Sequence, residues 1–202
     1  MSIKYNLKTD LEEAKAMAEG LADYVRGEQL YGHTGGSFFS NMPRLTVGAL
    51  LMRLRRLDNF RDLMEDRQYK TLDQVVDQWQ SVRNDWRLHY EQKMQHELNS
   101  RLDSMKTFFR ECDESPVACR NNYRPELMRR TIVQEIIREL DDLNVELEDK
   151  SQTKIEMVDN KFRRIMRDVE FQWAEGLEGS YPKDEFWWLY SRPPVPEEDK
   201  LS

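Results

Sequence analysis

The chain has 202 residues, of which 39% are hydrophobic and 34% charged, and its formal net charge is -7. A compact sphere of this size needs more apolar side chains than a bundle in which each helix buries one stripe, so the composition favours elongation or oligomers with a shared core. The acidic balance weighs against a dedicated nucleic-acid binder, and two cysteines exclude a disulfide framework.

The N-terminus carries no recognisable signal peptide, because Met1 to Asn6 lead directly into a charged segment. No stretch of the chain approaches the roughly 18 apolar residues that a membrane span requires. We therefore expect a soluble, cytoplasmic protein without a membrane span.

The residues from Ala49 to Glu175 contain no glycine and only two prolines, Pro116 and Pro125. On either side of these prolines, apolar residues recur at three- and four-residue steps, as the buried face of an α-helix requires. The spacing predicts two very long helices that fold against each other.

Four helices are predicted in chain order, over residues 9–27, 44–68, 71–111 and 125–175. Capping boxes that begin at Thr9 and Thr71 mark two of the starts, because threonine and the Glu or Gln three residues later satisfy free backbone N–H groups. Pro125 suits the first position of the fourth helix. The apolar stripe of that helix slips by one residue between Leu147 and Ile155, within what the pattern otherwise indicates to be one helix.

The sequence thus predicts an all-α fold: an elongated antiparallel helical hairpin or bundle of about four helices, two of them very long. We expect one helical domain over residues 1–180 and an aromatic, proline-rich tail over residues 181–202. The tail is expected to fold back as a strap, since exposing its aromatic side chains costs about 25 cal/mol per Å² of apolar area.

The same tail is the candidate partner-binding segment. It combines the densest aromatic cluster of the chain with a Pro-x-x-Pro spacing that favours the polyproline II conformation, which adaptor domains bind. The candidate partner-binding residues are Phe186, Trp187, Trp188, Tyr190, Arg192, Pro193 and Pro196.

Two basic clusters are candidate surfaces for nucleic acid or for a membrane surface. The first consists of Arg53, Arg55 and Arg56 in the second helix, and the second of Lys161, Arg163, Arg164 and Arg167. Both clusters have acidic neighbours. The alternative for the first cluster is therefore a core helix whose arginines pair with the abundant acids on its solvent face.

No catalytic, cofactor-binding or metal-ligating set of residues is recognised. His89 and His96 share one face of the third helix, yet Trp86 and Lys93 occupy the positions where a di-iron bundle needs glutamate. The glycine-rich loop over residues 32–39 lacks the Lys-Ser/Thr ending of a P-loop. We accordingly predict no metal and no cofactor.

Cys112 and Cys119 bracket the turn between the two long helices. They lack both nearby histidines for a zinc site and the spacing of a redox motif. Separate, reduced thiols are the expectation for a cytosolic protein, and a reversible disulfide across the turn is the alternative.

The leading functional prediction is a non-enzymatic interaction or structural protein, a scaffold or an oligomerising coiled coil, whose partner is another protein or a second copy of itself. Helices of the predicted length offer more lateral surface than the rest of the chain covers, and their charged flanking positions suit partner choice. One alternative is nucleic-acid or membrane-surface binding through the basic clusters. The other is an enzyme with an unrecognised acidic site, which the absence of the usual catalytic motifs disfavours.

Overall fold

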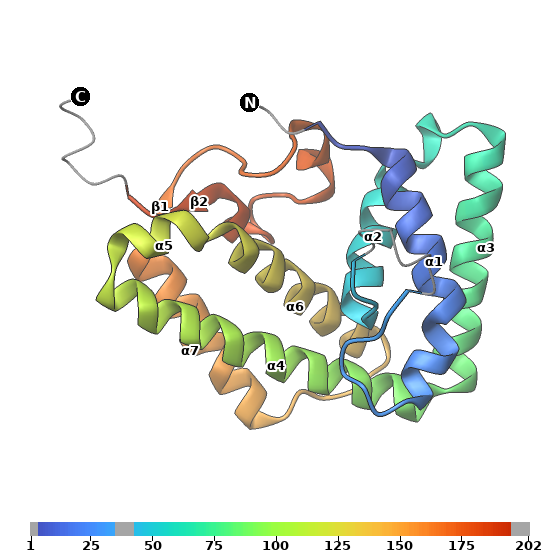
Figure 1. The fold of residues 1–202 in the computed structure, drawn as a ribbon, viewed down its shortest axis with the longest axis horizontal. Coiled ribbons are helices and arrows are strands. Elements are labelled where there is room, and N and C mark those ends of the chain that lie inside the picture. The colour runs from blue at the N-terminus through green and yellow to red at the C-terminus, as the bar shows by residue number, and fades with distance from the viewer. Residues whose placement is uncertain (1–3, 35–42, 195–202) are drawn as a thin grey trace. The chain divides into compact units, whose positions relative to one another are not determined.

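The computed structural model describes residues 4–34 and 43–194, and these residues are mostly helical (Figure 1), which confirms the predicted all-α class. The α-helices are α1 (Leu7–Arg26), α2 (Val47–Asn59), α3 (Asp66–Asp85), α4 (Arg87–Glu114), α5 (Pro116–Asn122), α6 (Arg124–Asp142) and α7 (Asp149–Ile165). Short 3-10 helices and an antiparallel two-stranded sheet complete the described part: η1 (Arg61–Leu63), η2 (Glu175–Ser180), η3 (Trp187–Tyr190), β1 (Arg167–Asp168) and β2 (Ser191–Arg192).

The described residues divide into two compact units, each built from segments that are far apart in the sequence. The first, called here the α1 unit, consists of the described residues within 5–98 and of residues 135–145. The second, the α7 unit, consists of Lys4, residues 99–134 and residues 146–194. Helices α4 and α6 are each divided between the two units, α4 after residue 98 and α6 after residue 134. The single domain predicted over residues 1–180 stays a prediction.

In the α1 unit, helix α1 packs against both α2 and α3 (Figure 1). Asn6 caps its start by accepting a hydrogen bond from the backbone N–H of Thr9 at 3.1 Å. The helix therefore begins at Leu7, two residues before the predicted start at residue 9. Gly27 ends the helix. The buried face combines bulky side chains with Ala14 and Ala18, whose small size lets neighbouring backbones approach closely.

The helix predicted over residues 44–68 is shorter in the structure. Thr46 caps α2 by accepting a hydrogen bond from the backbone N–H of Ala49 at 3.2 Å, so the helix begins only at Val47. It ends at Asn59, and η1 follows it.

The helix predicted over residues 71–111 is two helices. α3 starts at Asp66 rather than at Thr71, because Glu65 and Gln68 form the capping box. Trp86 then interrupts the helix with a backbone conformation of φ -120° and ψ 31°, and α4 begins at the next residue.

The single helix predicted over residues 125–175 is wrong. The structure has α6 and α7, with a loop over residues 143–148 between them, so the described part contains seven α-helices rather than about four. Asn144 adopts the left-handed conformation with φ 55°, which asparagine tolerates better than most residues. The backbone N–H of Val145 bonds back to the carbonyl of Leu140 at 2.8 Å and closes the end of α6.

Because of this loop, α7 does not continue an antiparallel hairpin with α4. Three side-chain pairs step along both helices in the same direction: Ser151 with Asn99 (3.3 Å), Lys154 with Asp103 (2.8 Å) and Lys161 with Asp113 (2.7 Å). In the α7 unit these two helices therefore run parallel.

The aromatic segment that follows α7 packs on helices of its own unit. Trp188 is buried and donates a hydrogen bond from its indole N–H to the hydroxyl of Thr131 on α6 at 3.0 Å. The half-buried ring of Trp187 meets the ring of Phe162 on α7, with 6.0 Å between the centroids. The segment ends in β2, which pairs with β1.

A disulfide between Cys112 and Cys119 joins the end of α4 to α5, and both side chains are buried. Ser115 caps α5 by accepting a hydrogen bond from the backbone N–H of Ala118 at 3.3 Å, and this short helix brings the second cysteine back towards the first. The structure thus contains the alternative pairing and not the separate thiols expected from the sequence.

Gly32 is required by close packing in the α1 unit. It exchanges two backbone hydrogen bonds with Leu45, at 2.9 and 3.0 Å, and a Cβ atom at this position would lie 2.7 Å from Cδ2 of Tyr24. We expect Gly32→Ala to lower the free energy of unfolding by about 2 kcal/mol, because the buried tyrosine must move. Urea unfolding followed by circular dichroism measures the effect.

The control is Gly20→Ala, whose new Cβ would lie 3.2 Å from the side-chain end of Leu45 and 4.0 Å from the carbonyl oxygen of His33, without a contact as short as that at Gly32. Alanine also favours the helix that contains this position. If Gly20→Ala destabilised the protein as much as Gly32→Ala, the close approach to Tyr24 would not be the cause.

Candidate functional site

A half-open groove of about 480 Å³ lies between α4 and α7 in the α7 unit. We call it the α4–α7 groove. Both helices line it, with Asp103, Lys106, Thr107, Phe109, Arg110 and Asp113 from α4, and with Met157, Val158 and Lys161 from α7. The parallel packing of the two helices brings these segments together, although they are about 50 residues apart in the sequence.

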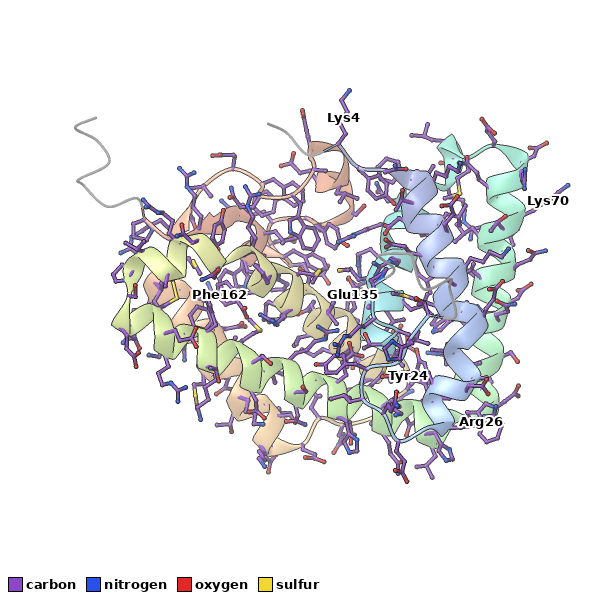
Figure 2. The ribbon with its side chains drawn as sticks, in the orientation of Figure 1. Lys4, Tyr24, Arg26, Lys70, Glu135 and Phe162 are labelled. Carbon is purple, nitrogen blue, oxygen red and sulfur yellow. A yellow bond between two sulfur atoms is a disulfide. The ribbon has the colours of Figure 1, made fainter. Side chains whose placement is uncertain are left out.

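The floor of the groove is apolar. Phe109 and Val158 are 1% and 2% exposed, and Phe109 packs edge to face on Phe162, which Figure 2 labels on α7, with 4.8 Å between the ring centroids. Met157 stands at the edge of this floor and is 41% exposed. An apolar partner atom seated here would therefore contact chiefly the adaptable side chain of Met157, since Phe109 and Val158 expose almost no surface.

The α4 rim of the groove carries unneutralised positive charge. Lys106 and Arg110 are both exposed and lie one helical turn apart. Within residues 4–34 and 43–194, neither side chain has an ion pair or a hydrogen bond. Like charges at this spacing repel each other weakly, so the pair does not stabilise the helix.

The acids of the groove, in contrast, already have cationic partners. Asp113 accepts hydrogen bonds from Lys161 and from Arg164, each at 2.7 Å, and these contacts, led by the bond from Lys161, lower the pKa of the Asp113 carboxyl. Asp103 pairs with Lys154 at 2.8 Å. The net charge that the groove offers to a ligand is therefore positive.

A second hollow of about 400 Å³ lies along the other side of α7. It shares Met157 and Lys161 with the α4–α7 groove, and its further lining residues are Thr153, Glu156, Asn160 and Arg164. The two hollows together form an extended surface along α7 rather than one enclosed pocket.

The arginines predicted as a basic patch lie inside the α1 unit and pair with acids. Arg53 pairs with Asp10 and Glu13, and Arg56 also approaches Asp10, at 3.8 Å. Arg55 donates a hydrogen bond at 2.5 Å to Glu135, which Figure 2 labels on α6. All three side chains are at most one-fifth exposed, so carboxylates neutralise most of this cluster.

The second basic cluster is divided between two environments. Lys161 and Arg164 line the groove and the hollow beside it, whereas the guanidinium of Arg163 lies 4.0 Å from the ring centroid of Trp187. Arg167 is exposed in β1 and bonds to backbone carbonyls near the end of α7.

The predicted partner-binding residues of the tail are mostly buried. The buried ones are Phe186, Trp188, Tyr190 and Pro193; Trp187 is half-buried and Arg192 is exposed in β2. Pro196 lies outside the described residues. A partner could reach the buried side chains only if the segment left the helices of its own unit.

Sequence reasoning did not single out Lys106, Arg110 or Met157. Two signals were present in the sequence. Lys106 and Arg110 are like charges four residues apart, and Met157 lies next to the buried stripe that Val158 and Phe162 define on α7. Neither signal identifies a groove unless the pairing of the two helices is known.

The buried carboxylate Glu139 belongs to a polar network in the α1 unit. It accepts hydrogen bonds from Arg83 at 2.5 Å and from the hydroxyl of Tyr90 at 3.3 Å, and Trp79 donates its indole N–H to that hydroxyl at 2.8 Å. Burial raises the pKa of Glu139, while the hydrogen bond and the charge of Arg83 oppose that rise. The network ties α3, α4 and α6 together.

Glu126, in the first turn of α6, is the most perturbed carboxyl of the α7 unit. Its side chain is 3% exposed; Arg129 donates a hydrogen bond to one oxygen, and no described residue donates to the other. Burial raises the pKa of Glu126 to about 7, with a further contribution from Glu111, although Arg129 acts in the opposite direction. Glu126 does not line the groove.

We expect the stability of the protein to fall as the pH rises from 4.5 to about 7. In this range the unfolded chain releases the Glu126 proton whereas the folded chain keeps it, so raising the pH favours unfolding. The loss reaches about 3.5 kcal/mol at most, since the shift from 4.5 to about 7 spans about 2.5 pKa units and each unit corresponds to about 1.4 kcal/mol. Glu126→Gln should remove this loss and be more stable than the native protein above pH 7.

Urea midpoints of both proteins across this pH range check the prediction. Exposed Glu114 provides the matched control, Glu114→Gln, for the removal of one carboxylate. Parallel stability curves for the native protein and Glu126→Gln would contradict the assignment.

No cluster of three or more His, Cys, Asp or Glu side chains in residues 4–34 and 43–194 has the arrangement of a metal site. His89 is exposed and contacts the ring of Trp86. In the part of the chain that the structure describes, no helix combines the length and the apolarity that crossing a membrane requires.

The fold and the groove define a helical protein with an open, cation-rimmed surface. Comparison with protein-family models, with curated proteins and with solved structures finds no significant match to this chain.

Proposed function

We propose that the protein is a non-enzymatic interaction protein that binds a protein partner in the α4–α7 groove. The observation that carries this proposal is the combination of a partly exposed apolar side chain, Met157, with two exposed cations, Lys106 and Arg110, that no described residue neutralises. Exposed surface of this kind is typical of interaction sites, because it stabilises nothing within the chain itself.

The shape of the surface favours a macromolecular partner over a small molecule. Small-molecule sites commonly enclose about 70–90% of their ligand. The α4–α7 groove is half open and continues along α7 into the second hollow through Met157 and Lys161. A segment of another protein could occupy both hollows, whereas a small ligand would stay largely in water.

The enzyme alternative has less support. The carboxyls with the clearest upward pKa shifts are Glu126, Glu139 and Asp10, and arginines contact each of them. None lines the groove. Their environments fit structural ion pairs better than a general acid or base that substrate can reach.

The nucleic-acid and membrane-surface alternative is also disfavoured. Carboxylates neutralise Arg53, Arg55 and Arg56, and the chain carries a net charge of -7. We therefore prefer the interaction role, as a cytoplasmic scaffold with helices in an elongated arrangement, over binding to nucleic acid or to a membrane surface.

A selection experiment tests the role of the groove. A library of displayed peptides about 16 residues long, roughly four helical turns, is selected on the native protein. The bound peptides are then compared on Thr107→Trp, which fills the groove, and on Leu88→Trp, a change at an exposed apolar position of α4 in the α1 unit. We expect peptides that bind the native protein and Leu88→Trp but not Thr107→Trp.

Peptides that bind all three proteins alike, or no enrichment above an empty support, would contradict the proposal. Circular dichroism confirms that both variants fold. Mass measurement with small-angle scattering tests self-association and elongation: a dimer that Thr107→Trp dissociates would make a second copy the occupant.

A further inference from the structure

We propose that the segment bound in the α4–α7 groove is an acidic amphipathic helix of a different protein. Its apolar side chains would rest on the exposed side chain of Met157, and its carboxylates would pair with Lys106 and Arg110. This inference rests on the proposed function and specifies the chemistry of the partner.

The charge of the partner follows from the pairing of the groove residues. Asp103 and Asp113 are already bound to cations, at 2.8 Å from Lys154 and 2.7 Å from Lys161. Lys106 and Arg110 are the rim charges that lack a counter-charge among the described residues. Complementary charges across an interface give specificity, so the missing groups are carboxylates.

The spacing of these cations favours a helical segment. Lys106 and Arg110 lie four residues apart on α4, which is roughly 6 Å along the helix axis. Carboxylates three or four residues apart on a partner helix have the same spacing. A groove between two helices also accepts the side-chain ridge of a third helix, with apolar anchors at i, i+3, i+4 and i+7.

A second copy of this chain does not satisfy the same surface. In a twofold dimer the same patch faces itself, so Lys106 and Arg110 of both copies would meet without added carboxylates. Like charges facing each other are costly at an interface. A different, acidic protein avoids this repulsion.

A nucleic acid also fits the groove less well than an acidic helix. Phosphates would approach Asp103 and Asp113, which stand on the same helix as the two cations. The apolar floor at Phe109 and Val158 is buried and presents no exposed aromatic face on which a base could stack. Single-stranded DNA is therefore the competitor in the test and not the proposed occupant.

The test repeats the peptide selection on charge variants of the full chain. The double variant Lys106→Glu/Arg110→Glu reverses the rim, and Lys70→Glu reverses an exposed lysine of α3 in the α1 unit, labelled in Figure 2. We expect the native protein and Lys70→Glu to enrich acidic peptides with apolar residues at helical spacing. The double variant should enrich basic ones.

Synthetic copies of the most enriched peptide then give affinities by fluorescence anisotropy. We expect binding to the double variant to be about tenfold weaker or worse than binding to Lys70→Glu. A peptide in which glutamine replaces every acid should bind the native protein and the double variant alike.

The outcomes separate the two proposals. Peptides that need an open groove, as Thr107→Trp reports, but show no excess of acids would overturn the acidic partner and leave the proposed function standing. Peptides that do not depend on the groove would overturn both. Single-stranded DNA that displaces the peptide more effectively than unlabelled peptide does would overturn the inference in favour of a nucleic acid.

Discussion

Replacing Trp188 with alanine should lower the free energy of unfolding of the α7 unit by about 4 kcal/mol, because a large buried aromatic side chain leaves a cavity. Trp188 is 1% exposed, and the guanidinium of Arg130 lies 4.1 Å from its ring centroid. Arg130 also donates hydrogen bonds to both carboxylate oxygens of Asp159, at 2.7 and 3.0 Å. The indole ring of Trp188 thus holds in place the Arg130 guanidinium, which links α6 to Asp159 on α7. Urea unfolding followed by circular dichroism measures the effect.

Trp187→Ala is the matched control, since the neighbouring ring is only half-buried. Its cost should be less than half that of Trp188→Ala. Equal effects of the two substitutions would show that burial of Trp188 against α6 does not stabilise the unit as described. Trp188→Phe keeps an aromatic ring but loses the hydrogen bond to Thr131. Its free energy of unfolding should therefore lie between those of the native protein and of Trp188→Ala.

Replacing Arg53 with alanine should destabilise the α1 unit by about 4 kcal/mol, because it removes the closest counter-charge of buried Asp10 and of half-buried Glu13. The side chain of Arg53 is 8% exposed and lies 2.5 Å from Glu13 and 3.4 Å from Asp10. Burial already raises the pKa of Asp10, and Arg56 and Arg53 oppose that rise. The same urea unfolding measurement applies.

Two controls identify the cause of this loss. Lys15→Ala removes an exposed pair with Glu19 at 3.8 Å and should cost less than about 1 kcal/mol. Adding Asp10→Asn and Glu13→Gln to an Arg53→Met background should restore most of the stability, since neither carboxylate then remains charged without Arg53. If Arg53→Met alone matched the native protein, the ion pairs would not stabilise α1 against α2.

The elements that sequence reasoning predicted well are those with local signals. The apolar spacing of α1 and its stop at Gly27 are properties of one helix, and the structure has both. Periodicity likewise identified the helical character of the long glycine-free run. The all-α class follows from such signals alone.

The breaks inside that run were harder to predict because the local pattern has two explanations. A one-residue slip between Leu147 and Ile155 fits either a distorted continuous helix or a loop. The structure has a loop, which Asn144 permits by adopting φ 55°. After Trp86 the apolar stripe also shifts, to Tyr90 and Met94, but such a shift fits a change of packing along one helix as well as the interruption that the structure has.

The groove depends on a tertiary arrangement that no local pattern encodes. Its α4 residues lie within 103–113 and its α7 residues within 157–161, and only the parallel packing of the two helices brings them together. The tail was ambiguous for the opposite reason. Aromatic residues such as Trp188 suit both a core and a docking segment, and burial is decided by the surface available to cover them.

Because each unit is built from segments that are far apart in the sequence, the order of synthesis on the ribosome limits when each unit can fold. The α1 unit needs residues 135–145, which are synthesised 37 residues after residue 98 (135 minus 98). At about 5–20 residues per second, this delay is on the order of 2–7 seconds. Until then Arg55 and Arg83 lack Glu135 and Glu139. The α1 unit therefore cannot finish folding before residues 99–134 of the α7 unit have been made, and the α7 unit cannot finish before the whole α1 unit has been made.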